Sequence, residues 1–314
     1  MIPLVAVVGP TATGKSKLAL QLAVDLEGEI VSADSAQVYR YLDIGTAKPT
    51  LKERQTVKHH LIDVIDPHEE FSVAEYKKLA DEAIDDIYEK GKLPILCGGT
   101  GLYINAVTER FAFSSSGKNP QLRQQLDETA REKGLDHLYS LLKEVDPDSA
   151  QKIHPHDKKR IIRALEVYYT EGVLLSRQQK ETLNRPSRFH LLLLGLNKPR
   201  EELYRAIERR TDSMMEKGFV EEVKWLLENY PAHAPGLNVL GYRQIRDYLQ
   251  NLISYHEAVE SIKKETRNYA KRQLTWFRRD ERVRWFNPHE TDLSSLEKFI
   301  NDFLQEKDTS RRIT

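Results

Sequence analysis

The stretch that decides the fold stands near the start of the chain: IPLVAVVGPTATGKSKLALQLAVD, residues 2–25. Within it, residues 4–8 form a short apolar run rich in β-branched side chains, which is typical of a strand buried on both faces of a parallel sheet. After residue 15, apolar side chains recur at helical spacing as far as Leu26. The segment therefore predicts a strand, a glycine-containing loop and a helix.

The loop itself, GPTATGKS at residues 9–16, matches the phosphate-loop motif G-x-x-x-x-G-K-[ST]. In such a loop the two glycines let the backbone wrap closely, and the amides of residues 12–16 point at a phosphate from a helix N-terminus. Lys15 neutralises phosphate oxygens, and Ser16 is placed to hold Mg²⁺. The motif predicts that a diphosphate or triphosphate binds with Mg²⁺, and it does not imply ATP hydrolysis. The predicted phosphate-binding residues are Gly9, Pro10, Thr11, Ala12, Thr13, Gly14, Lys15 and Ser16.

Apolar runs elsewhere in the chain predict further strands and helices. Strands are expected at 29–34, 60–65, 93–99 and 190–196. Ser72 and Glu75 form a capping-box signature at the head of a helix that continues to about Tyr88. Strands that alternate with helices indicate an α/β fold, here a P-loop NTPase-like parallel sheet flanked by helices.

The middle of the chain has a different pattern, because strand-like runs are missing between Phe111 and Pro186. Helical patterns separated by Asp-Pro and His-Pro breaks replace them. We therefore expect an all-helical insertion domain at 111–185, set into a core formed by 1–110 and 186–314. After residue 200 every pattern is helical, which predicts a helical C-terminal region.

Composition narrows the class of protein. The 314 residues carry zero formal net charge and a single cysteine, Cys97, which excludes a disulfide framework and a zinc site of paired cysteines. No apolar run approaches the roughly 20 residues of a membrane span, and no signal-peptide pattern precedes the first strand. We expect a cytoplasmic protein with no membrane association, a monomer, in which Cys97 belongs to the core.

Charge is unevenly distributed, and residues 263–284 hold nine lysines and arginines against three acidic residues. At about 100° per residue, four of these cations share an arc of roughly 60° on a helix from about 262 to 279. These cations are Lys264, Arg267, Lys271 and Arg278. The opposite side is apolar or aromatic and carries Ile262, Tyr269, Leu274, Trp276 and Phe277. One packed face and one cationic face predict a surface for a polyanion such as RNA.

An ATPase or kinase normally adds to the phosphate loop an Asp at the end of a second apolar strand, where it organises Mg²⁺. Asp34 ends the apolar run EIVSAD, so its carboxylate should project from the carboxyl edge of the sheet, where open α/β folds bind ligands. Asp63 and Asp66 are the other candidates, and their positions within a strand and before Pro67 favour structural roles.

Eight collinear segments together resemble one family. They are GPTATGKS, DSAQVYR (34–40), GTAKPT (45–50), HHLIDVIDP (59–67), GGTGLYI (98–104), HDKKRIIRALE (156–166), LGYRQ (240–244) and RNYAKRQLTWFR (267–278). In order and spacing they resemble the tRNA isopentenyltransferase family, the tRNA dimethylallyltransferases of bacteria. The resemblance implies transfer of a dimethylallyl group from dimethylallyl diphosphate to the exocyclic amine (N6) of the adenosine just 3′ of a tRNA anticodon, with release of diphosphate.

The same resemblance implies roles for individual residues. Asp34 matches the proposed general base, Thr100 a residue that hydrogen-bonds near the reacting amine, and Arg123 an arginine that reaches toward diphosphate and tRNA. Lys15 assists departure of diphosphate, and Ser16 binds the expected cofactor, Mg²⁺. The expected partners are dimethylallyl diphosphate and the tRNA anticodon stem-loop. The residues expected to contact tRNA are Asp34, Ser35, Ala36, Gln37, Lys159, Arg160, Arg163, Gly241, Tyr242, Arg243, Gln244, Arg267, Lys271 and Arg278.

Three other functions are compatible with parts of this pattern. A P-loop small-molecule kinase would use Arg160 and Arg163 as lid arginines, but it has no need of the basic C-terminal helix. An adenylate isopentenyltransferase would share the phosphate loop and use a free nucleotide as acceptor. A tRNA-binding module without enzymatic activity would not require the intact phosphate loop together with Asp34.

Overall fold

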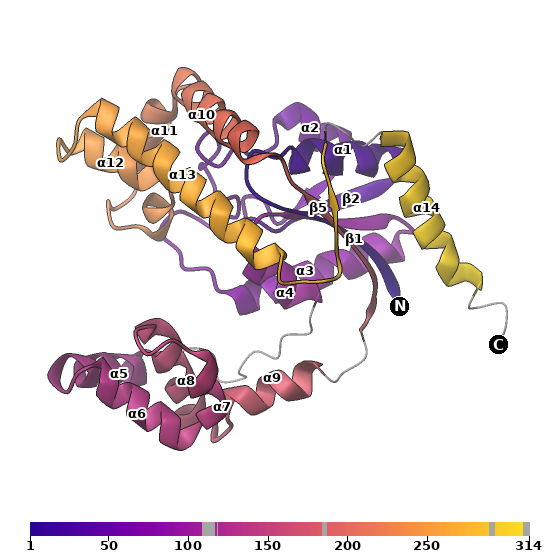
Figure 1. Cartoon of the computed structure of the whole chain (residues 1–314). Coiled ribbons are helices and arrows are strands. Elements are labelled where there is room, and N and C mark those ends of the chain that lie inside the picture. Colours follow the sequence, from indigo (N-terminus) through magenta and orange to yellow (C-terminus); the bar gives the residue numbers. More distant parts are fainter. Residues whose placement is uncertain (109–116, 118, 184–186, 289–292, 310–314) are drawn as a thin grey trace. The chain divides into compact units, whose positions relative to one another are not determined.

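The computed structural model describes residues 1–108, 117, 119–183, 187–288 and 293–309. The chain divides into two compact units, Met1–Thr108 with Arg188–Thr314, and Glu109–Ser187 (Figure 1). The boundaries expected at 111 and 185 lie outside the described residues. Among the helices that are described, none combines the length and apolar character needed to cross a membrane.

The first unit is built on a parallel sheet of six strands, which confirms the predicted α/β class. The strand order is β3-β2-β4-β1-β5-β6, so β1 lies between β4 and β5. The strands are β1 (Ile2–Val8), β2 (Gly28–Ser32), β3 (His59–His60), β4 (Leu93–Gly98), β5 (Phe189–Leu196) and β6 (Val283–Phe286).

Strand β1 is buried on both sides, and its side chains alternate between two cores. Leu4, Ala6 and Val8 pack with helices α3 (Val73–Glu89) and α4 (Gly101–Thr108) on one face of the sheet. Val5 and Val7 face the other side. The helices that cover this side are α1 (Lys15–Asp25) and α14 (Leu293–Thr309), and α2 (Leu51–Thr56) precedes β3. The continuous apolar run in the sequence follows from this two-sided burial.

The start of α3 is fixed by the predicted capping box. The Glu75 backbone amide donates to Ser72 Oγ at 3.2 Å, and the Ser72 amide donates to Glu75 Oε2 at 2.7 Å. Both bonds satisfy amides that have no partner within the first helical turn.

The C-terminal helices form a third core beside the sheet. They are α10 (Arg200–Glu216), α11 (Phe219–Asn229), α12 (Tyr242–Leu249) and α13 (Tyr255–Phe277), with a 3₁₀ turn η1 at Pro235–Asn238. Their buried side chains pack with Val38 and Leu42 from the segment that follows β2. This packing brings the C-terminal region onto the carboxyl edge of the sheet, where Figure 1 shows α10 and α13.

Two of the sequence predictions for this unit were wrong. The strand expected at 60–65 is only two residues long, because Leu61 and Asp63 have positive φ angles of 61° and 58° that break the extended backbone. The region after residue 200 is not entirely helical, since β6 pairs with β5. Strand β6 has only four residues, of which Val283 alone is buried, so it lacks the apolar run by which a central strand is recognised.

The second unit is helical, as the insertion was expected to be. Its helices are α5 (Pro120–Glu132), α6 (Leu135–Val145), α7 (Pro147–Lys152), α8 (Lys158–Glu171) and α9 (Leu175–Leu183). Leu138 and Leu142 of α6 and Ile161 and Leu165 of α8 are fully buried in its core.

Candidate functional site

The loop between β1 and α1 has the backbone of a phosphate loop. Gly9 has a φ of 133°, and a Cβ there would lie 2.3 Å from the Leu196 carbonyl oxygen, so only glycine fits. Gly14 has a φ of 101° and immediately precedes α1. The loop therefore ends on a helix N-terminus, where free amides favour an anion.

Two side chains of this loop fold back on it. Lys15 Nζ donates to the Pro10 carbonyl oxygen at 2.6 Å, and Thr13 Oγ1 donates to the same oxygen at 2.8 Å. Burial and, to a lesser extent, Arg210 lower the pKa of Lys15 while Cys97 and Asp34 oppose them, and the resulting pKa is about 8. A partly desolvated cation beside free helix amides is the electrostatic arrangement that a diphosphate would satisfy.

The loop opens into a cavity of about 460 Å³ at the carboxyl edge of the sheet. Strands β1, β2 and β4 bring their following residues to this edge, and α10 and α13 close the other side. Sequence-predicted residues gathered here are Thr11, Lys15, Ser16, Asp34, Ser35, Ala36, Gln37, Gly241 and Arg243. The structure thus joins the predicted phosphate site and much of the predicted acceptor site in one space.

Asp34 and Thr100 belong to adjacent turns on this edge. Asp34 Oδ1 accepts a hydrogen bond from the Ala36 amide at 2.9 Å, which fixes the carboxylate in a turn. Thr100 Oγ1 accepts from the Ser35 amide at 3.0 Å, and the Thr100 amide donates to the Ala33 carbonyl at 3.1 Å. These bonds hold the two turns together, since β2 and β4 are neighbours in the sheet.

Arg210 is a cation of the cavity that the sequence analysis did not identify. Its Nη1 donates to Thr11 Oγ1 at 3.0 Å and its Nη2 to the Thr46 carbonyl at 3.3 Å. Burial lowers the pKa of the guanidinium, and Asp34 opposes that shift. The signal was available, because Arg210 falls on the apolar stripe of α10 between Ile207 and Met214.

Tyr269 was predicted to pack in the interior and instead lines the cavity. Burial and the nearby Asp34 raise its pKa to about 12, and hydrogen bonding with Thr100 and Gln273 acts in the opposite direction. The phenol is therefore a neutral hydroxyl beside the carboxylate at neutral pH. Helical spacing alone could not distinguish a cavity wall from a core position.

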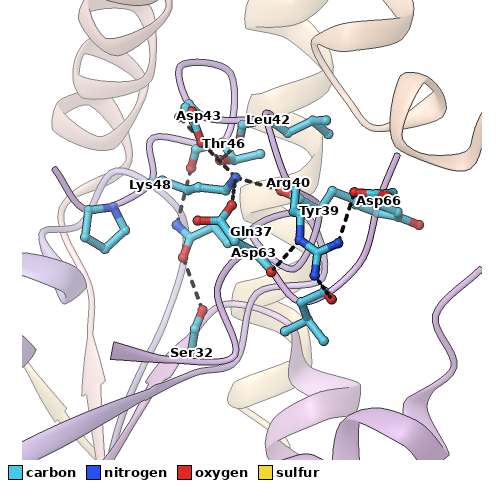
Figure 2. A network of polar contacts seen from close by, with 12 residues as sticks. Ser32, Gln37, Tyr39, Arg40, Leu42, Asp43, Thr46, Lys48, Asp63 and Asp66 are labelled. Atoms are coloured by element: carbon cyan, nitrogen blue, oxygen red, sulfur yellow. Dashed lines mark hydrogen bonds and ion pairs between the residues drawn. The ribbon is translucent and has the colours of Figure 1, made fainter. Parts of the chain in front are cut away.

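Lys48 fixes the loop that follows β2 (Figure 2). Its side chain is 1% exposed, and its Nζ donates to Asp43 Oδ1 at 2.8 Å, Asp63 Oδ1 at 2.6 Å and the Tyr39 carbonyl at 2.6 Å. Arg54 donates to Asp63 Oδ2 at 2.6 Å. Burial alone would raise the pKa of Asp63, but hydrogen bonds from Lys48 and Arg54 outweigh it and lower the pKa. The structural role predicted for Asp63 is confirmed.

Two further side chains complete this network (Figure 2). Arg40 Nη1 pairs with Asp66 Oδ1 at 3.1 Å, so the structural role predicted for Asp66 is also confirmed. Gln37 accepts from Ser32 Oγ at 3.1 Å and donates to the Thr46 carbonyl at 3.4 Å. The Gln37 carboxamide therefore lies between the sheet edge and the cavity wall.

The expected tRNA contact of Tyr242 is wrong for this structure, because the ring is fully buried. Its hydroxyl donates to Glu222 Oε1 at 2.5 Å, and Glu222 also accepts from the amides of residues 43–45. Gln244 is buried too, with its Oε1 accepting from the Gly241 amide at 2.8 Å. Both side chains support the cavity wall and are too buried for a nucleic acid to contact. Arg243, in contrast, lines the cavity.

The predicted cationic face of α13 is largely present. Lys264, Lys271 and Arg278 are exposed. Arg267 differs, because its Nη1 pairs with Glu208 Oε1 of α10 at 2.9 Å, with only a quarter of the arginine side chain exposed. Arg267 thus joins two helices of the first unit.

The remaining predicted cations belong to the helical unit. Arg123 donates to both carboxylate oxygens of Glu166, through Nε and Nη2, each at 2.8 Å. Arg163 Nη1 donates to Glu166 Oε2 at 2.7 Å, and Glu166 is 1% exposed. Lys159 and Arg160 are exposed on the same unit, at the start of α8. Glu166 thus orients Arg123 and Arg163, whose contacts with diphosphate or tRNA stay predictions.

Comparison with solved structures extends over almost the whole chain. The crystal structure of the full-length tRNA isopentenylpyrophosphate transferase from Bacillus halodurans superposes with a TM-score of 0.75 at 40% identity, covering 99% of this chain and 100% of that one. A eukaryotic dimethylallyltransferase, crystallised acting on tRNA, gives a TM-score of 0.82 at 31% identity, covering 98% of this chain and 80% of that one.

Curated relatives are closer still in sequence. A protein of Halothermothrix orenii named tRNA dimethylallyltransferase is 47% identical over 306 residues, which cover 96% of this chain and 93% of the relative. One of the same name from Caldanaerobacter subterraneus is 50% identical over 288 residues, 91% of either chain. The family model described as IPP transferase matches residues 37–280. The chain with this cavity therefore belongs to the IPP transferase family.

Proposed function

We propose that this protein transfers the dimethylallyl group of dimethylallyl diphosphate to the exocyclic N6 amine of the adenosine 3′-adjacent to a tRNA anticodon. The observation that carries the proposal is the single cavity that joins a phosphate loop to the carboxylate of Asp34. Relatives named tRNA dimethylallyltransferase, and one crystallised acting on tRNA, support the same reaction. A kinase that shares the phosphate loop would not account for these relatives.

The donor half of the cavity suits a diphosphate leaving group. The free amides at the start of α1 and the charges of Lys15 and Arg210 face the place where phosphate oxygens would lie. When the C1–O bond of the donor breaks, negative charge grows on the diphosphate, and these groups stabilise it. The dimethylallyl group of the donor would then lie in the cavity near Asp34.

The residues present fit the expected Mg²⁺. Ser16 is exposed at the helix N-terminus and lines the cavity, and phosphate loops hold Mg²⁺ with one hydroxyl together with substrate phosphates. Ser16 would hold the ion, which would supply positive charge to the diphosphate. Lys15 and Arg210 share that task.

The acceptor half suits a weak nucleophile. The N6 lone pair of adenosine is delocalised into the purine, so bond formation to C1 is assisted when a base removes the N6 proton. Asp34 would accept that proton while the N6–C1 bond forms and diphosphate leaves. Thr100, fixed through the Ser35 amide, lies in the adjacent turn and would hydrogen-bond the amine.

An adenosine inside a stacked loop must be extruded to reach a cavity at a sheet edge. Single-stranded loops allow such extrusion at modest cost. Ser35, Gln37 and Arg243 line the cavity and would contact the extruded base or its neighbours, and the exposed cations of α13 would bind backbone phosphates. Lys159, Arg160 and Arg163 would contribute further phosphate contacts. Because tRNA is the acceptor, we place the activity in the cytoplasm. We propose that the protein acts as a monomer.

One assay tests the function against its alternatives. The protein is incubated with labelled dimethylallyl diphosphate, Mg²⁺ and either unmodified tRNA or AMP, and the acceptor that gains label is identified. We expect label only in tRNA, at the adenosine beside the anticodon. Label in AMP alone would indicate an adenylate isopentenyltransferase, turnover of ATP with a free acceptor would indicate a kinase, and binding of tRNA without transfer would indicate a binding module.

A further inference from the structure

The inward side of α13 carries a buried carboxamide that contacts two separate loops of the site. Gln273 is 6% exposed, and its Oε1 accepts from the Thr11 amide at 2.9 Å. Its Nε2 donates to the Gly99 carbonyl oxygen at 2.9 Å. Thr11 belongs to the phosphate loop and Gly99 to the turn after β4, so one side chain bridges the donor side and the acceptor side.

The turn after β4 is shaped to receive this helix. A Cβ at Gly99 would lie 2.1 Å from Gln273 Nε2, and a Cβ at Gly101 would lie 2.3 Å from Trp276 Cδ1. Neither position leaves room for a side chain while α13 stays in place. Figure 1 shows the end of α13 beside α4, which begins at Gly101. The glycines on either side of Thr100 thus let α13 seat directly on the turn.

Two hydrogen bonds extend the bridge toward the reacting groups. Thr100 follows Gly99, and its Oγ1 accepts from the Ser35 amide, next to Asp34. On the donor side, Thr11 Oγ1 accepts from Arg210. A shift of Gln273 would therefore move the turn that carries Thr100 relative to the loop that holds the diphosphate.

The outward side of the same helix is cationic. At about 100° per residue, Gln273 lies roughly 180° from Lys264 and about 160° from Lys271, so the bridge and the exposed cations occupy opposite sides of α13. RNA bound to the outward side would therefore contact the same helix whose inward side sets the spacing of both loops.

We propose that Gln273 is a positioning residue for the transfer step, one that sets the distance between the phosphate loop and the Thr100–Asp34 turn. This inference rests on the proposed function. Transfer requires the amine and the donor carbon in line about 3–3.5 Å apart, and a displacement of about 1 Å can reduce the rate by a factor on the order of 100. Because Gln273 does not hold charge on either substrate, its loss should affect the rate more than substrate binding.

The test is a Gln273→Met variant, which keeps the length of the side chain and removes the hydrogen bonds with Thr11 and Gly99, together with the one to Tyr269. We expect the single-turnover rate at saturating dimethylallyl diphosphate and tRNA to fall about 10- to 100-fold. The KM values for both substrates should stay within about threefold, because the diphosphate and RNA contacts are intact. Thr275→Ala, an exposed position on the same helix, serves as the matched control and should retain the wild-type rate.

A second variant guards against a folding defect. Gln273→Glu keeps the oxygen that accepts from the Thr11 amide. It replaces the amide that donates to the Gly99 carbonyl with a carboxylate oxygen, which repels that carbonyl. We therefore expect a loss of rate at least as large as in Gln273→Met. Melting temperatures of all variants are measured to confirm that the compared samples are folded. A wild-type rate in either Gln273 variant, or a loss confined to KM, would overturn the inference. Absence of transfer by the wild-type protein would overturn the proposed function instead.

Discussion

The phosphate loop and the loop that follows β2 border the same cavity, but they are held in different ways. The phosphate loop takes its local shape from eight consecutive residues, with Lys15 and Thr13 bonded to Pro10 of the same loop, and its hydrogen bonds with the distant Gln273 and Arg210 both involve Thr11. The loop after β2 depends on distant partners, since Lys48 binds Asp63 and the amides of residues 43–45 donate to Glu222 of α11. The comparison suggests that substitutions in the first loop alter charge at the substrate, whereas those in the second alter the geometry of the wall.

The largest effect is expected at Asp34, which stands at the start of the loop after β2 and lines the cavity. Asp34→Asn keeps the shape of the side chain and removes the proton acceptor, so the single-turnover rate should fall by roughly 100- to 10,000-fold, about 3 to 5 kcal/mol. Affinity for tRNA should stay within a few-fold. Asp66→Asn, whose carboxylate pairs with Arg40, is the matched control and should retain transfer. If Asp34→Asn retained more than a tenth of the wild-type rate, Asp34 would not be the base.

Lys15→Ala tests the phosphate loop as an electrostatic device. The lysine binds the diphosphate in the ground state and stabilises its growing charge in the transition state, so both donor KM and rate should worsen. The expected loss in rate is on the order of 100- to 1,000-fold, about 3 to 4 kcal/mol. Lys17→Ala, an exposed lysine two residues further along α1, should behave as wild type. Unchanged donor kinetics in Lys15→Ala would mean that the loop binds another ligand.

Features set by neighbouring residues could be predicted from the sequence, whereas features set by contacts between distant segments could not. The strand, loop and helix at residues 2–25 are determined by neighbouring residues, so periodicity and one motif were sufficient. Arg210 and Tyr269 were missed because each contacts the cavity only after helices distant in sequence pack on the sheet edge. Tyr242 was assigned to tRNA from its segment, and its burial follows from contacts with Glu222 that no local pattern reveals.

Lys48→Met probes the second loop as a packed structure. The substitution keeps much of the volume but leaves Asp43 without its lysine and Asp63 with Arg54 alone. Breaking a buried ion pair costs about 3–5 kcal/mol, and since Asp63 is one-third exposed we expect roughly 2 to 3 kcal/mol in the free energy of unfolding. Urea denaturation measures this loss, with Lys52→Met, an exposed lysine on α2, as control. Equal midpoints for the two variants would show that the network does not hold the loop.

The smallest effect is expected on the outward side of α13, where the contacts are exposed and screened by salt. Lys271→Ala combined with Arg278→Ala removes two exposed cations, whereas Arg267→Ala removes a cation already paired with Glu208. Each lost phosphate contact lowers the slope of log affinity for tRNA against log salt by about 0.7 to 0.9. The double variant should therefore flatten the slope by roughly 1.4 to 1.8 while donor KM and saturated rate stay unchanged.

Arg267→Ala provides the contrast that separates RNA binding from helix packing. Because its guanidinium joins α13 to α10, we expect it to lower the melting temperature and to change the salt slope less than either exposed cation does. Fluorescence anisotropy of a labelled anticodon stem-loop, measured from low to physiological salt, gives the slopes. An unaltered slope in the double variant would mean that these cations form a solvated surface, and the backbone contacts would then have to be sought elsewhere, beginning with Lys159 and Arg160 of the helical unit.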